Sequence, residues 1–221
     1  MRHGLTVAPC VRTLSVLVVL LLRPELSPAQ SARYDINGFR EARFGMTEPE
    51  VRAVARASFG AKDEEMTLRT NTVDGTTMLL VHARKLEPGL PEGRVVYQFG
   101  YQSRRLIQVD VIWGEDTNQP LNDSGMVEGG ARLQRFFLGF AWRPGSVRAG
   151  FPAGDNTVLL FSGEDDRKGA VRLTIEGIVY QTTVNGVLTT SPDPQSPPKL
   201  TVTYVADRSD ADIRRITRSD F

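Results

Sequence analysis

Apolar and polar residues alternate along two neighbouring stretches near the middle of the chain. In the first stretch, residues 94–101, the apolar residues on one side are Val95, Tyr97, Phe99 and Tyr101. In the second stretch, residues 106–113, they are Ile107, Val109, Val111 and Trp113. A period of two is typical of a strand with one buried face. The polar QSRR between the stretches is short enough for a hairpin, so we expect two antiparallel strands.

Further strands are indicated on both sides of this hairpin. Residues 77–84 are apolar on both faces, which predicts a central strand, and residues 67–73 suit an edge strand. Downstream, the strand-like segments are residues 157–163, 170–180 and 200–206. The Pro- and Ser-rich segment 189–199 is interpreted as a loop or an extended connector. In the charged tail, Ile213 and Ile216 indicate a final helical turn.

The stretch RFGMTEPEVRAVARASFG, residues 43–60, has the signals of a helix start. Thr47 is a good N-cap, and Glu50 three residues later completes a capping box. Pro49 lies in the first turn, where its missing N–H costs nothing. Gly60 suits the end of the helix. The apolar stripe of this helix consists of Val51, Val54, Ala55 and Phe59. Every residue type in the stretch thus has a structural role.

A second helix is expected at about residues 126–140, with an apolar stripe of Leu133, Phe136, Phe137 and Phe140. The loop 114–125 precedes it, and Gly129 and Gly130 weaken its first half. The order is helix then strands, twice. We therefore expect an α+β fold with helices packed on an antiparallel sheet, possibly as two such units in tandem. The units would span residues 30–120 and 121–221, or together form one continuous domain.

The first 29 residues have the layout of a secretory signal peptide. A basic start is followed by the apolar run Leu14–Leu22 and a small-residue site ending at Ala29. An uncleaved anchor would need about 20 apolar residues, and this run stops at Arg23. The single cysteine, Cys10, precedes the apolar run, so it is no lipid anchor. We expect a cysteine-free mature chain in the bacterial periplasm or secreted, with no stable membrane span after cleavage.

The charge balance narrows the range of partners. Without the leader, 24 basic residues stand against 25 acidic ones. This is not the basic footprint of a nucleic-acid binder, so no nucleic-acid partner is expected. Another envelope protein is the expected partner, and the sequence leaves the oligomeric state open.

No pattern in the mature chain indicates catalysis or a bound metal. Its one histidine, His82, lies within an apolar strand and is interpreted as a strand residue with a hydrogen-bond partner. The acidic segment 163–169 lacks the alternating ligands of a calcium loop and suits a solvated hairpin turn. SPPK at 196–199 matches the S-x-x-K motif of penicillin-binding enzymes in residue types alone. That motif must begin a helix, and the two prolines argue against a helix here. We expect no cofactor and no catalytic residue.

Two groups of aromatic residues are candidates for a binding surface. Tyr97, Phe99, Tyr101 and Trp113 would either line a binding face or pack under the first helix, and the pattern favours packing. The loop 142–156 carries Trp142, Arg143, Arg148 and Phe151. Exposed aromatic and arginine side chains suit a partner-binding edge, so these four residues are the candidate partner-binding residues. The alternative is that the aromatic residues anchor the loop.

The motif FGMTEPEV at 44–51, with Gly60 as a later glycine, resembles the opening of two related kinds of exported module. These are the outer-membrane assembly lipoproteins of the small-protein-A type and the secreted beta-lactamase-inhibitor protein. The matching residues are Phe44, Gly45, Met46, Thr47 and Val51. The resemblance implies a helix followed by an antiparallel sheet, and binding to another protein. The chain differs from the lipoproteins in having no cysteine just after the apolar run.

Together these observations predict a non-catalytic, exported envelope protein that binds another protein or a component of the cell envelope. A sheet face, the loop 114–125 or the loop 142–156 would supply the binding surface. Two alternatives stay open. One is a secreted proteinaceous enzyme inhibitor, and the other is a hydrolase that uses a pair of carboxylates.

Overall fold

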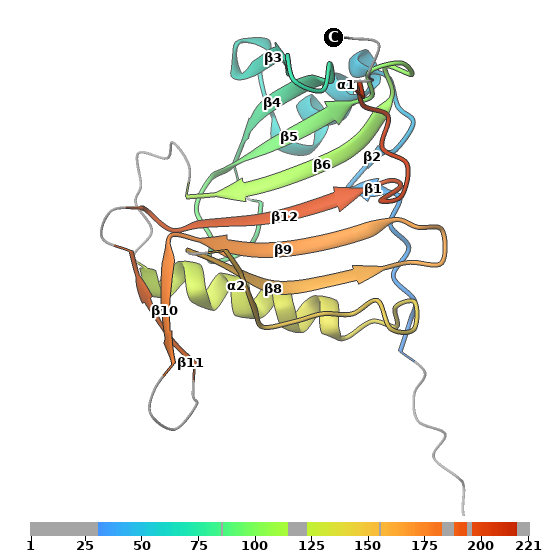
Figure 1. Ribbon diagram of the computed structural model, residues 1–221. Coiled ribbons are helices and arrows are strands. Elements are labelled where there is room, and N and C mark those ends of the chain that lie inside the picture. The colour runs from blue at the N-terminus through green and yellow to red at the C-terminus, as the bar shows by residue number, and fades with distance from the viewer. Residues whose placement is uncertain are drawn as a thin grey trace, which may run out of the picture. The chain divides into compact units, whose positions relative to one another are not determined.

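An eight-stranded antiparallel sheet forms the centre of the fold, and both helices pack on one of its faces (Figure 1). The computed structural model describes residues 31–84, 86–114, 123–154, 156–182, 188–193 and 196–215. The expected signal peptide, Cys10 and most of the expected loop 114–125 lie outside these residues. The α+β class, with helices packed on an antiparallel sheet, is confirmed.

The two halves of the sheet meet at its centre. In spatial order the strands are β3 (Met66–Thr70), β4 (Thr77–Ala83), β5 (Gly93–Phe99), β6 (Leu106–Trp113), β12 (Lys199–Val205), β9 (Ala170–Glu176), β8 (Thr157–Glu164) and β7 (Phe151–Gly154). Helix α1 (Glu48–Phe59) precedes β3–β6, and α2 (Asp123–Leu138) precedes the other half. The strands β6 and β12, which end the two halves, pair with each other. The helix-then-strands order therefore occurs twice within one continuous sheet.

The alternation of side chains along each strand determines which residues lie on the sheet face that the helices cover. Tyr97, Val109, Tyr204 and Val171 lie directly opposite one another on four neighbouring strands and are all buried. Residues at such positions point to the same face, and a slip of one residue would expose the whole row. Val51 and Ala55 of α1 and Met126 and Phe137 of α2 join the same core. The hydrophobic core therefore lies between this face and the helices.

The first helix begins and ends as the sequence predicts. The backbone N–H and the hydroxyl of Thr47 both donate to the Glu50 carboxylate, each at 2.7 Å. Glu48 pairs with Arg52 one turn later. Gly60 ends the helix in the left-handed region, at φ 64°, and its N–H donates to the carbonyl of Arg56. The interpretation of this stretch as a well-specified helix start is confirmed.

The second helix begins at Asp123, three residues earlier than expected, and its two glycines have a packing role. A Cβ atom at Gly129 would lie 2.4 Å from the side chain of Leu90, and one at Gly130 would lie 2.7 Å from that of Leu160. Glycine lowers helix propensity. Here it lets the helix approach the loop before β5 and strand β8 closely.

Three other expectations about local structure are corrected. The strand expected at 94–101 ends at Phe99, and Tyr101 lies in the following turn. The strand expected at 170–180 breaks at Gly177, which has φ 72°, and the chain leaves the sheet as β10 (Ile178–Thr182). Part of the expected loop 189–199 is a strand, β11 (Leu188–Pro192), which pairs with β10 in a projecting hairpin (Figure 1).

Up to Arg215, where the described residues end, the C-terminal tail docks in an irregular conformation with no helical turn. Its residue Asp212 accepts hydrogen bonds from the backbone N–H groups of Gln102 and Ser103, at 2.9 and 2.8 Å. Asp212 thereby ties the tail to the turn between β5 and β6. Ile213 has no helical structure, and Ile216 lies outside the described residues.

The face of the sheet opposite the helices carries a partly buried carboxyl group. Asp110 of β6 accepts hydrogen bonds from the Thr203 hydroxyl at 2.6 Å and from the Gln108 amide at 2.9 Å. Burial raises the pKa of Asp110, and the two hydrogen bonds offset part of this increase. Its ionised form is therefore less favourable in the folded chain than in the unfolded one.

We expect Asp110→Asn to make the protein more stable at pH 7. The folded pKa is raised above the unfolded value of about 3.9. Stability is therefore greatest below that value and falls as the pH rises through the folded pKa. Asparagine does not ionise, so the variant avoids this pH-dependent loss of stability. Its gain in stability over the native protein should therefore shrink as the pH is lowered. Urea midpoints measured between pH 4 and pH 7 test this, with the exposed Glu128→Gln as control. If Asp110→Asn lowered the stability equally at pH 4 and at pH 7, this expectation would be contradicted.

Among the residues that the structure describes, no helix combines the length and apolar character needed to cross a membrane.

Candidate functional site

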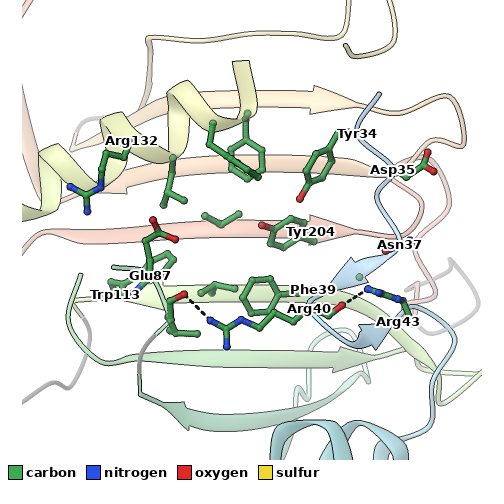
Figure 2. Close-up of a pocket in the computed structure, with 17 residues that line it drawn as sticks. Tyr34, Asp35, Asn37, Phe39, Arg40, Arg43, Glu87, Trp113, Arg132 and Tyr204 are labelled. Carbon is green, nitrogen blue, oxygen red and sulfur yellow. Dashed lines mark hydrogen bonds between the residues drawn. The ribbon is translucent and has the colours of Figure 1, made fainter. Parts of the chain in front are cut away.

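A cavity of about 370 Å³ lies on the helix-covered face, above the pair β6 and β12 where the two halves of the sheet meet (Figure 2). Its floor is formed by Val111 and Trp113 of β6 and by Val202 and Tyr204 of β12. Helix α2 forms one wall, the β4–β5 loop another, and the N-terminal segment a third. Segments far apart in the sequence thus meet at this point.

Helix α2 gives the cavity its apolar wall. The helix residues that line it are Arg132, Leu133, Phe136 and Phe137, which lie on one side because they are one turn apart in pairs. Phe137 is fully buried, whereas Phe136 keeps 52% of its surface exposed. The cavity therefore has an apolar interior with an aromatic side chain near solvent.

The N-terminal segment, residues 31–45, is called the strap here, and it forms the opposite wall. Its two short strands, β1 (Gly38–Phe39) and β2 (Ala42–Arg43), form a tight hairpin against β6 and β12. At the other end, the N–H of Ala141 donates to the carbonyl of Ala32 at 2.9 Å. The strap thus fills the space on the sheet that α1 and α2 leave between them.

The strap is also tied to the turn between β8 and β9. The backbone N–H of Ile36 donates to the buried carboxylate of Asp165 at 3.0 Å. Arg33 pairs with Asp166, and Asp35 pairs with Arg167 at 3.2 Å. The acidic segment expected to be a solvated hairpin turn does form a turn. Asp165 within it is buried and holds the strap.

Two tyrosines place hydroxyl groups in the cavity. Tyr34 of the strap and Tyr204 of β12 are hydrogen-bonded to each other, and Figure 2 shows their side chains converging. Burial raises the pKa of both, and for Tyr204 the nearby carboxylate of Glu87 raises it further. Both hydroxyls therefore stay protonated at neutral pH. They can donate and accept hydrogen bonds inside an otherwise apolar space.

Arginine side chains lie at several places around the cavity (Figure 2). The guanidinium of Arg40 donates to the carbonyl of Leu86 at 2.8 Å and lies 4.9 Å from the ring centre of Phe59. Arg132 donates to the carbonyl of Pro88 at 3.0 Å. Arg40 also has a positive φ of 52°, which is uncommon for a residue with a side chain. Hydrogen bonds and a cation–π contact thus fix these charges in place.

The arrangement suits the binding of a small molecule. Apolar walls with a few fixed polar groups are typical of small-molecule sites. Within the described part of the chain, no group of three or more histidine, cysteine, aspartate or glutamate side chains is placed to hold a metal ion. His82 is hydrogen-bonded to Glu92 at 2.8 Å, as the sequence predicts for a strand histidine with a partner.

None of the four residues expected to bind a partner lines this cavity. Trp142 packs against Tyr34 and Phe161, and its indole N–H donates to the carbonyl of Phe137 at 2.9 Å, so it anchors the loop. Arg143 pairs with Glu164, and Arg148 is exposed next to Ser162. Phe151, on the edge strand β7, is 54% exposed. A partner-binding role for these residues stays a prediction.

Of the aromatic residues expected to pack under the first helix, Tyr97, Phe99 and Trp113 are buried on the helix-covered face. The indole nitrogen of Trp113 has no hydrogen-bond partner among the described residues. Trp113 also lines the cavity, so a residue assigned to the core borders the candidate site as well.

Sequence reasoning missed most of the cavity. The alternation and helix signals assign no element to the strap, although Tyr34, Phe39, Arg40 and Arg43 all line the site. A usable signal was present, because aromatic and arginine residues alternate with turn residues in RYDINGFREAR, 33–43. The contribution of Tyr204 could not be recognised, because an apolar strand pattern does not show what lies above it.

Comparisons of the chain with protein-family models, with curated proteins and with solved structures found no match in any of the three. The resemblance of residues 44–60 to exported helix-and-sheet modules therefore stays a prediction.

Proposed function

We propose that the chain is a non-catalytic, exported protein of the bacterial envelope that binds an amphipathic envelope component in the cavity above β6 and β12. The observation that carries the proposal is the cavity itself, whose apolar floor and wall are joined to a polar side with two tyrosine hydroxyls. Its volume of about 370 Å³ lies within the range of small-molecule sites. The signal-peptide pattern supports an envelope location.

Filling the cavity should weaken binding. We expect Leu133→Trp to lower the affinity for the small uncharged dye 1-naphthylamine at least about tenfold, because the larger ring occupies the ligand space. Leu133 lines the cavity from α2. Dye fluorescence, excited outside the tryptophan band, gives the affinity.

Leu138→Trp is the matched control, since Leu138 is on the same helix, 49% exposed and outside the cavity lining. Near-ultraviolet circular dichroism of each variant reports native packing, because loosely packed states also bind such dyes. Equal dye affinity in the two variants, or no dye binding by the native chain, would count against the proposal.

Binding of another protein through the open sheet face is the second candidate, and it covers the inhibitor alternative. Leu80 of β4 and Ile112 of β6 are half-buried apolar residues on the face opposite the helices, and Val96 of β5 lies buried on the same face. Apolar surface that a sheet leaves accessible marks interaction sites in many proteins. In-cell crosslinking through this face to one envelope protein would favour this candidate over the cavity.

A further inference from the structure

The charges around the cavity are unequal, and this bears on the kind of ligand it holds. The lining includes Arg40, Arg43 and Arg132 on the basic side and Asp35 and Glu87 on the acidic side. The carboxylate of Asp35 is paired with Arg167, which does not line the cavity. Glu41, also outside the lining, lies beside Arg40 and Arg43, so the lining keeps only a small excess of basic charge, with three arginines against two carboxylates. An anionic group is favoured where basic charges predominate.

Two of these arginines are held by the same short loop. Arg40 donates to the carbonyl of Leu86, and Arg132 donates to the carbonyl of Pro88, so their bonds flank Glu87 in the chain. Arg40 comes from the strap and Arg132 from α2, on different walls of the cavity. A guanidinium has five N–H donors, and the bond to Pro88 uses one of those of Arg132. The loop thereby orients two cations that suit a carboxylate.

The rest of the cavity matches an apolar body of limited length. Val111, Val202, Leu133 and Phe137 provide aliphatic and aromatic surface, and the half-exposed Phe136 borders the same space. The volume of about 370 Å³, at about 30 Å³ for each water-sized group, accommodates about 12 non-hydrogen atoms. A fatty acid of about ten carbons has this size.

We infer that the ligand is an amphipathic carboxylate, with its head at an arginine side chain of the lining and its apolar chain over the β6–β12 floor. This inference rests on the proposed function, since it names the ligand class of the same cavity. The tyrosine pair adds hydrogen-bonding groups to the cavity, and Glu87 limits how much negative charge the site accepts. A single carboxylate fits this balance better than a group with several negative charges.

Three probes with the same ten-carbon chain test the sign of the head group: decanoate, 1-decanol and decyltrimethylammonium. Each displaces the uncharged dye 1-naphthylamine from the full chain, at constant ionic strength because salt screens charge. We expect decanoate to bind at least about tenfold more tightly than decanol, and the cation to bind least. A charge-assisted hydrogen bond to arginine accounts for a preference of this size.

Arg132→Gln should remove most of the preference for decanoate over decanol and leave decanol binding unchanged. Arg135→Gln is the matched control, since Arg135 is exposed on α2 and does not line the cavity. Arg132→Lys keeps the charge and should retain part of the preference, which excludes a general loss of folding.

The outcomes separate the two proposals. Equal binding of decanoate and decanol, or tightest binding of the cation, would overturn the carboxylate inference and leave the cavity as a binding site. If the dye does not bind to the native chain and no probe alters it, both proposals fail. A decanoate preference that Arg132→Gln leaves intact would place the head group elsewhere and overturn the inference.

Discussion

We expect Phe137→Ala to destabilise the protein by about 4 kcal/mol, the largest effect of any substitution considered for this chain. Phe137 is fully buried between α2 and the sheet. Its ring stacks on Phe161 at 5.4 Å and meets Tyr34 edge-on at 5.7 Å. Removing a buried ring loses its transfer free energy and leaves a hole that these neighbours fill only in part. The loss would be a large fraction of the total stability of about 5–15 kcal/mol.

Phe136→Ala is the control for this expectation. Phe136 is the next residue of the same helix and also lines the cavity, but it is 52% exposed. Its loss should cost about 1 kcal/mol, mainly through its edge-on contacts with Tyr34 and Phe140. Urea unfolding followed by circular dichroism measures both values. Similar costs for the two variants would contradict the packing described for α2.

The strands and the start of α1 were predictable because each depends on local patterns. Alternation in 106–113 fixes which side chains of β6 are buried, and the burial of Val109, Val111 and Trp113 follows from it. The capping residues Thr47 and Glu50 act within one helical turn, so the sequence contains the whole interaction. Helix packing on one sheet face followed from the apolar stripes of both helices.

The order of the strands within the sheet could not be predicted, because it depends on contacts between residues that are far apart in the sequence. The pairing of β6 with β12 joins residues about ninety positions apart, such as Asp110 with Thr203. The break at Gly177 was missed because glycine within a strand pattern indicates either a bulge or a bend. Here the carbonyls of Ser196 and Pro197 come within 2.6 Å of where a Cβ atom would lie, which leaves room for glycine alone.

The candidate site was the least predictable part for the same reason. It is assembled from the strap, the β4–β5 loop, α2 and two strands, and each contributes only a few side chains. Tyr34 and Tyr204 are hydrogen-bonded although they lie at opposite ends of the described chain. From the sequence alone, an aromatic loop residue such as Trp142 is easily interpreted as a binding residue. In the structure its side chain anchors the loop instead.

The strap itself should depend on one carboxylate, and we expect Asp165→Ala to destabilise the protein by about 3 kcal/mol. Asp165 is 5% exposed and accepts three backbone hydrogen bonds, from Ile36 at 3.0 Å, Arg167 at 2.8 Å and Gly169 at 2.9 Å. Alanine would leave three N–H donors without their acceptor, and buried donors of this kind cost more than the bond contributes. Asp165→Asn keeps one acceptor oxygen, so its cost should be smaller.

The neighbouring Asp166 separates this effect from a general loss of charge. Asp166 is 53% exposed and pairs with Arg33 at the surface, so Asp166→Ala should cost under about 1 kcal/mol. Hydrogen exchange at Ile36 should accelerate in Asp165→Ala and change little in Asp166→Ala. Because the strap forms a wall of the cavity, Asp165→Ala should also weaken dye binding under conditions where the chain is still folded. Equal exchange and equal stability in the two variants would show that the buried carboxylate does not hold the strap.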